Sequence, residues 1–149
     1  MTGRLHRDVP PRMVTLRADS RLENVELLAR AVRGLVAAAG LEGRECARVE
    51  LAVDEALNNV IRHAYGHAPG HPIELVFTLD ERCFTIEVAD EGEPMPPRRA
   101  PVLDFDPGDL EHLPEGGMGL FIIHSVMDQV EYRSAGGRNS LVMTRRLAA

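Results

Sequence analysis

Three polar residues recur at intervals of four between Val49 and Tyr65: Glu55, Asn59 and His63. Because a helix has about 3.6 residues per turn, this interval returns each of them to nearly the same side. We therefore expect one polar stripe along a helix, at the margin of its apolar face. A carboxylate one turn from a carboxamide can act as a base beside a ligand of a hard cation. Taken alone, the stripe is more typical of an ordinary amphipathic helix with polar residues on its shoulder.

The other residues of this segment divide into two faces. The apolar positions form a broad arc: Val49, Ala52, Val53, Ala56, Leu57, Val60, Ile61 and Ala64. Asp54, Asn58 and Arg62 fall on the opposite side, where we expect a solvated face. The pattern predicts a helix from about Arg44 to Ala64, ended by Gly66 and the pair Pro69-Gly70. Its arc would face the core and its polar stripe would border a cleft.

Two short glycine motifs follow in the sequence, Asp90-x-Gly92 and Gly117-x-Gly119. A carboxylate at a strand end can accept a hydrogen bond from the amine of adenine, and Gly92 would let the ring approach the backbone. Glycines that open a helix offer N–H groups to phosphates, and an oxygen of Asn59 suits Mg²⁺. Each motif alone is weak evidence, but their order on suitable elements favours nucleotide binding. The chain lacks the P-loop pattern.

The remaining segments predict a small α+β domain. We expect strands at 12–17, 73–79, 83–89, 129–133 and 140–146, and helices at 21–39, 44–64 and just after Gly119. Ser20 and Glu23 match a capping box for the first helix, and Gly40 suits its C′ position. Adjacent strands without crossover helices indicate a two-layer sandwich, with a mostly antiparallel mixed sheet and helices on one face. Residues 1–10 are expected to form a flexible arm, and residues 11–149 a single domain.

Composition excludes several classes of partner. The formal net charge is −6, from 17 basic and 23 acidic residues, which argues against direct binding of nucleic acid or anionic membranes. No apolar run is long enough to span a membrane, and the first residues lack the apolar core of a signal peptide. Cys46 and Cys83 lie far apart and without a C-x-x-C pattern, which favours reduced thiols. We therefore expect a cytoplasmic protein.

In their order, the three motifs resemble the N-box and the two glycine boxes of the GHKL ATPases, which have the Bergerat fold. The resemblance is greatest to the small anti-sigma factor serine/threonine kinases, in which a lid ends in G-G-x-G-[LI] before a helix. Here that stretch is Gly116-Gly117-Met118-Gly119-Leu120, and it precedes Val126-Met127-Asp128-Gln129-Val130-Glu131-Tyr132. The resemblance extends from about Val14 to Leu147. It implies an ATP-binding sandwich with a lid at about 91–117.

The resemblance also implies roles for individual residues. Asn59 would hold Mg²⁺, Asp90 would bind the adenine amine, and Glu55 would be the base that accepts the proton of an attacking serine. The remaining nucleotide-binding positions that it implies are His63, Gly92, Gly116, Gly117, Met118, Gly119 and Leu120. The first glycine box departs from the wider D-x-G-x-G pattern, because Pro94 replaces its second glycine. Proline fixes φ and stiffens this end of the lid.

By the same resemblance, the chain would be a protein serine/threonine kinase and an anti-sigma factor. It would phosphorylate a serine of a small STAS-domain antagonist, sequester a sigma factor and form a homodimer. The alternative is an ATP-loaded binding module that holds a protein partner without phosphoryl transfer. The carboxylate of Glu55 favours the kinase, because a module that only binds ATP has no need of a base.

Overall fold

The computed structural model describes residues 9–96 and 118–148, and the structural statements below concern these residues. They form β1 (Arg12–Asp19), α1 (Leu22–Ala38), α2 (Gly43–Asn59), the π-helical segment η1 (Val60–Ala64), β2 (Pro72–Leu79), β3 (Cys83–Asp90), α3 (Met118–Val126), β4 (Gln129–Ala135) and β5 (Arg138–Arg146). This is the predicted order of helices and strands. Most of the expected N-terminal arm and most of the expected lid, residues 97–117, lie outside the described residues.

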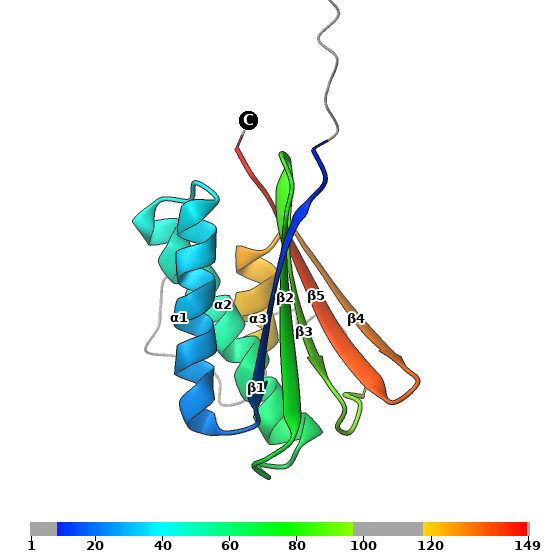
Figure 1. The fold of residues 1–149 in the computed structure, drawn as a ribbon. Helices are drawn as coiled ribbons and strands as arrows, with labels where there is room; N and C mark the ends of the chain where they lie inside the picture. The colour runs from blue at the N-terminus through cyan, green and yellow to red at the C-terminus, as the bar shows by residue number, and fades with distance from the viewer. Residues whose placement is uncertain (1–8, 97–117, 149) are drawn as a thin grey trace, which may run out of the picture.

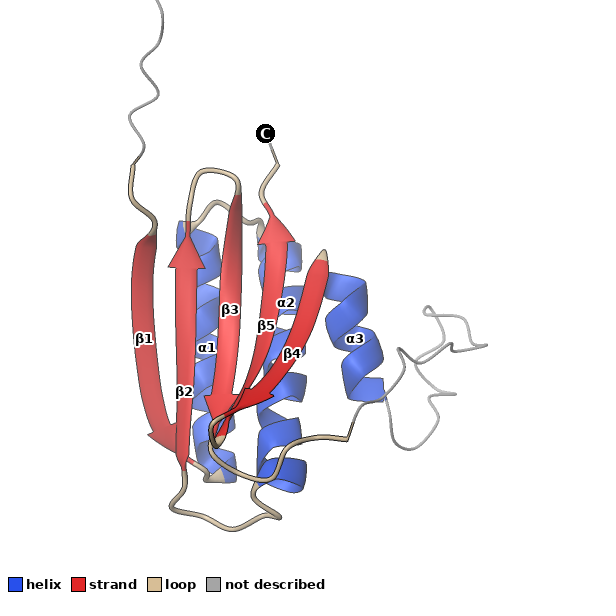
Figure 2. Cartoon of the chain, turned by 90° about the vertical axis from the view of Figure 1, so that its right-hand side faces the viewer, coloured by secondary structure: helices blue, strands red, loops and turns tan. Residues whose placement is uncertain are grey.

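The strands form a five-stranded sheet in the order β1-β2-β3-β5-β4. All four pairings are antiparallel. The helices cover one face of this sheet, and no described helix covers the other face (Figures 1 and 2). The predicted α+β sandwich with helices on one face is therefore confirmed. Among the described residues, no helix has the length and apolar character that crossing a membrane requires.

The core lies between the sheet and the helices. Alternate residues of β2 and β3 point into it, as expected for strands with one covered face. They are Ile73, Leu75, Phe77, Phe84, Ile86 and Val88. The predicted apolar arc of α2 packs against them, with Val49, Ala52, Val53 and Leu57 fully buried. The arc therefore fixes which sides of α2 remain available for polar groups.

The first helix ends as predicted but begins differently. Gly40 has φ +103°, and the N–H groups of Gly40 and Leu41 donate to the carbonyls of Ala37 and Val36 in a Schellman motif. The predicted capping box is wrong, because the N-cap is Arg21 and has no side-chain cap. Ser20 instead donates to the carbonyl of Ala68 at 2.6 Å and accepts from the N–H of His71 at 3.0 Å.

The central helix extends to Ala64 as predicted, but its last turn is π-helical. The N–H of Tyr65 accordingly donates to the carbonyl of Val60, five residues earlier. The predicted solvated face is only partly correct. Arg62 is exposed, whereas Asp54 and Asn58 are half-buried. Their side of α2 is not fully open because α1 packs along this helix (Figure 1).

The last two strands are longer than predicted. Residues 134–139 lie between the two predicted strands and have the composition of a turn, yet β4 continues to Ala135 and β5 begins at Arg138. Only Gly136 and Gly137 connect them, and Ala135 pairs directly with Arg138. The extension carries Asn139 into the sheet opposite Asp90.

Candidate functional site

Asp90, the last residue of β3, is buried, with only 7% of its surface exposed. Its Oδ1 accepts hydrogen bonds from Nδ2 of Asn139 at 2.8 Å and from the N–H of Gly92 at 2.9 Å. Burial raises the pKa of Asp90, and these two hydrogen bonds lower it in part. Both bonds fall on Oδ1, so Oδ2 is the oxygen that remains to accept from a ligand.

Asn139 is a site residue that the sequence analysis missed. It is 2% exposed and contacts both Asp90 and the carbonyl of Gly92, at 2.9 Å. It belongs to no motif, and it lies one residue before the predicted strand 140–146. The signal that would have found it is the strand register, which places it directly opposite Asp90.

Gly92 has a packing role that differs from the one expected. A Cβ at Gly92 would lie 2.3 Å from the carbonyl oxygen of Ala64 and 2.6 Å from its carbonyl carbon. The adjacent N–H of Glu93 donates to that same oxygen at 2.9 Å. The glycine is therefore needed because the end of η1 lies against this corner. The corner holds Asp90 close to the central helix.

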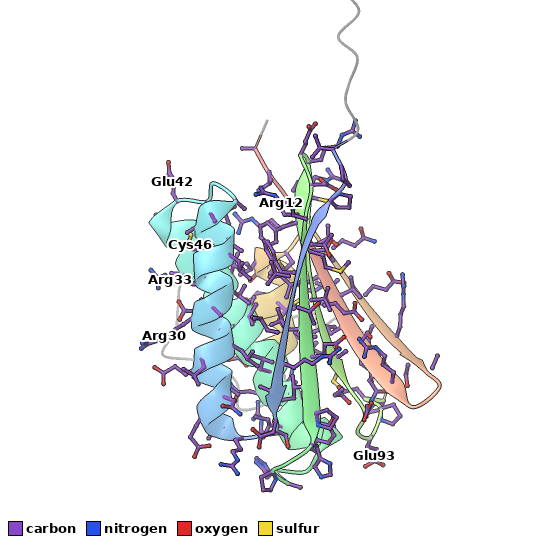
Figure 3. The ribbon with its side chains drawn as sticks, in the orientation of Figure 1. Arg12, Arg30, Arg33, Glu42, Cys46 and Glu93 are labelled. Atoms are coloured by element: carbon purple, nitrogen blue, oxygen red, sulfur yellow. The ribbon has the colours of Figure 1, made fainter. Side chains whose placement is uncertain are left out.

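A small hollow of about 20 Å³ lies beside Asp90. Its lining is largely apolar around a few polar groups: Ala56, Asn59, Val60, Ala64, Val88, Asp90, Glu93, Met95, Tyr132 and Leu141. Tyr132 accepts a hydrogen bond from the N–H of Met95 at 2.8 Å. Glu93 lies at the lower end of the molecule in Figure 3, whereas Glu42 and Cys46, at the start of α2, lie toward the upper end. Apolar walls around a carboxylate suit a flat base that carries an amine.

The hollow as it stands has no room for a purine ring. Met95 and Glu93 form one wall, and they belong to the segment that directly follows β3. A bound base therefore requires the lining to open, and Glu93 and Met95 are the lining residues that lie outside helices and strands.

The second part of the candidate site is the stripe on α2. Glu55 and Asn59 are both half-buried. Gly119, in the first turn of α3, lies over both of them: its Cβ would be 2.8 Å from Oε2 of Glu55 and 3.5 Å from Nδ2 of Asn59. The N-box stripe and the second glycine box, far apart in sequence, thus meet here. Asn59 also lines the hollow beside Asp90, so it connects the two parts of the site.

The environment of Glu55 favours a base. Burial raises its pKa above the ordinary value for a glutamate, and the neighbouring charge of Asp54 raises it further. Arg62 acts in the opposite direction and lowers it. A carboxylate with a raised pKa binds a proton more readily at neutral pH, which is what general-base catalysis requires.

The structure does not bring all the predicted site residues together. His63 is exposed on η1 and does not line the hollow. The turn that carries it is π-helical, with i→i+5 hydrogen bonds, and not the continuous α-helix on which the stripe was predicted. Leu120 is half-buried and packs against the core. Gly116 and Gly117 lie outside the described residues, as does the side chain of Met118.

A larger hollow, of about 520 Å³, lies between the start of α1 and the end of α2. Leu22, Asn58, Arg62 and Pro69 are among the residues that line it. None of the motif residues Glu55, Asn59, Asp90, Gly92 or Gly119 does so. We therefore place the candidate site at the smaller hollow, where the motifs converge.

The family described as "Histidine kinase-like ATPase domain" matches residues 18–145. Because the match spans most of the chain, the protein belongs to this family. The expected resemblance to ATPases of this class is thereby confirmed.

Similar proteins include the "Serine-protein kinase RsbW" of Bacillus cereus (strain AH820) and that of Bacillus anthracis, each 29% identical over 132 residues. Each alignment covers 87% of this chain and 82% of the relative. The protein of the same name from Bacillus thuringiensis (strain Al Hakam) is 28% identical over 133 residues.

A solved structure has the same fold. It is the crystal structure of the RsbU and RsbW domains of Rv1364c from Mycobacterium tuberculosis, with a TM-score of 0.61 and 18% identity. The likeness covers 93% of this chain but 32% of that one. The chain thus corresponds to about a third of that solved protein.

Proposed function

We propose that this protein is an ATP-dependent serine/threonine protein kinase that also acts as an anti-sigma factor. The observation that carries the proposal is the meeting of Glu55, Asn59 and Gly119, together with Asn59 lining the hollow beside Asp90. The relatives named serine-protein kinases support the same activity, since they align over most of both chains.

Asp90 would bind the adenine of ATP. Its buried carboxylate is oriented by two donors on Oδ1, which leaves Oδ2 to accept from the 6-amino group. Val88 and Leu141 line the same hollow and would contact the faces of the ring. The donor set therefore fits adenine, provided that the segment 93–95 moves outward.

Asn59 would contribute its side-chain oxygen to Mg²⁺. Mg²⁺ takes few protein ligands and several phosphate oxygens, so one carboxamide at the edge of the hollow suits it. When bound, the ion would neutralise charge on the phosphates during transfer. The first turn of α3 would offer N–H groups to the phosphates, as the N-termini of helices do.

Glu55 would act as the general base. A serine hydroxyl of the substrate attacks the γ-phosphorus, the bond from phosphorus to the leaving oxygen of ADP breaks, and the serine proton passes to Glu55. Half burial and a raised pKa suit the carboxylate to this proton transfer. A module that only held ATP would gain nothing from a half-buried carboxylate at this place.

The partners follow from the resemblance to anti-sigma factor kinases. The substrate would be a serine of a small STAS-domain antagonist, and the sequestered partner would be a sigma factor. We also propose a homodimer on this basis.

Two measurements test the proposal. Calorimetric titration with ATP and magnesium should give saturable heat that Asp90→Asn reduces, and Asn59→Ala should remove the magnesium-dependent part of the affinity. Pull-down from native cytosol, with and without Mg-ATP, should recover a partner that takes labelled phosphate on serine. No heat at millimolar nucleotide would contradict ATP binding. ATP binding without phosphate transfer to any recovered partner would favour the binding module instead.

A further inference from the structure

Three polar residues form a row across three neighbouring strands at the Asp90 end of the sheet. Ser134 of β4 pairs with Asn139 of β5, which pairs in turn with Asp90 of β3. Residues paired across strands project on the same face, so their side chains can interact directly. The row begins at an exposed residue, Ser134, and ends at two buried ones.

The hydrogen bonds in this row fix the carboxamide of Asn139 in one orientation. Its Oδ1 accepts from the hydroxyl of Ser134 at 2.6 Å. Its Nδ2 donates to Oδ1 of Asp90 at 2.8 Å and to the carbonyl of Gly92 at 2.9 Å. If the amide were flipped, its oxygen would face two acceptors, the carboxylate and the carbonyl. The two acceptors therefore fix the orientation in which Nδ2 donates to Asp90, and Ser134 donates to the amide oxygen in that orientation.

The consequence for Asp90 is a defined pattern of donors and acceptors. Oδ1 accepts hydrogen bonds from Nδ2 of Asn139 and from the N–H of Gly92, and both donors stabilise the ionised carboxylate. Oδ2 is then the oxygen that remains to accept from a ligand in the hollow, which Asp90 lines. Without the amide donor, a buried carboxyl takes up a proton more readily, and a protonated carboxyl can also donate a hydrogen bond.

The two common purines differ at just this point. Adenine has an amine at position 6, which donates, and guanine has an oxo group there, which accepts. An ionised carboxylate accepts from the amine and repels the oxo group, whereas a protonated carboxyl can donate to the oxo group.

We propose that Ser134 and Asn139 are positioning residues that set the preference for adenine over guanine, by holding Asp90 as a pure hydrogen-bond acceptor. Asn139 acts directly on Asp90, and Ser134 acts through Asn139. The inference rests on the proposed binding of ATP at Asp90 and goes beyond it, because Ser134 does not line the hollow.

The test compares the affinities for ATP and GTP, each with magnesium, in the full-length protein. Ser134→Ala removes the hydroxyl from an exposed position and should leave the fold intact. We expect it to lower the ratio of ATP to GTP affinity by roughly three- to tenfold, the range that one hydrogen bond contributes. Ser134→Thr retains a hydroxyl and should restore the ratio. A residue with a merely structural role would change the melting temperature or both affinities together, but not their ratio.

Ser140→Ala is the matched control. Ser140 adjoins Asn139 but donates to Oε1 of Glu87 at 2.8 Å, so its loss should leave the ratio unchanged. If the wild-type protein prefers ATP and Ser134→Ala keeps the same ratio, this inference is overturned while the proposed function stands. If the wild-type protein binds neither nucleotide, both are overturned.

Discussion

Gly119 lies directly over the carboxylate of Glu55: a Cβ added to this glycine would be 2.8 Å from Oε2. The contact joins the first turn of α3 to the middle of α2, two segments that are distant in the sequence. It leaves no space for a side chain at position 119 unless Glu55 changes its conformation. The position of the proposed base is thus coupled to the helix that would bind the phosphates.

Gly119→Ala should impair phosphoryl transfer with little effect on stability. The added methyl group meets the end of a flexible side chain, so we expect the free energy of unfolding to change by about 1 kcal/mol or less. Displacement of Glu55 should slow transfer by roughly ten- to a hundredfold. Initial rates with labelled ATP and a thermal melt measure the two effects. A wild-type rate would contradict the role of this contact.

Gly92→Ala should have the opposite profile and destabilise the fold. Its Cβ would lie 2.3 Å from a backbone oxygen of Ala64, so the end of η1 must shift. We expect a loss of about 1–3 kcal/mol in chemical denaturation, the usual cost of overpacking. Gly43→Ala is the control, because a Cβ there meets no atom within 4 Å. Equal stability of the two variants would contradict the packing role of Gly92.

The acidic limb of the pH–rate profile should shift to lower pH in one variant and to higher pH in another. The raised pKa of Glu55 means that transfer is lost as the pH falls through a value above that of an ordinary glutamate. Asp54→Asn removes the like charge and should shift this limb to lower pH, and Arg62→Gln removes the cation and should shift it to higher pH. The dependence of the single-turnover rate on pH measures both. Profiles that coincide with the wild type would argue against Glu55 as the titrating group.

Ser20→Ala should destabilise the protein more than the loss of a helix cap would. The buried hydroxyl donates to Ala68 and accepts from His71, so its removal leaves two backbone groups without this partner. We expect a cost of about 1–3 kcal/mol in chemical denaturation. A capping box would instead make Glu23→Ala comparably costly. Similar effects of the two substitutions would restore the capping-box interpretation.

Features that depend on local periodicity were predictable from the sequence. The spacing of Glu55 and Asn59 placed both on one shoulder of a helix, and the structure has them half-buried there. His63 is exposed instead, and it lies on η1, a π-helical turn that the spacing of apolar residues did not reveal. Periodicity thus predicted the helix but not its change of winding.

Features that depend on contacts distant in the sequence were not predictable. Ser20 has the sequence neighbours of a helix cap. In the folded chain, however, its hydroxyl is hydrogen-bonded to Ala68 and His71, which are distant in the sequence. Asn139 looked like part of a turn, and its contact with Asp90 follows from the pairing of β5 with β3. The lack of space for a side chain at Gly92 likewise depends on the position of Ala64, at the end of η1.

The measurement that tests the central claim most directly is phosphoryl transfer by Glu55→Gln. Single-turnover transfer of labelled phosphate to the serine substrate should be followed at saturating Mg-ATP, together with ATP affinity and partner binding. Glu50→Gln is the control, because Glu50 lies on the same helix and pairs with Arg33 at 2.9 Å. We predict that Glu55→Gln retains both kinds of binding and loses transfer by roughly 10²–10⁴-fold, while Glu50→Gln keeps the wild-type rate. Transfer by Glu55→Gln at near the wild-type rate would contradict the assignment of Glu55 as the base.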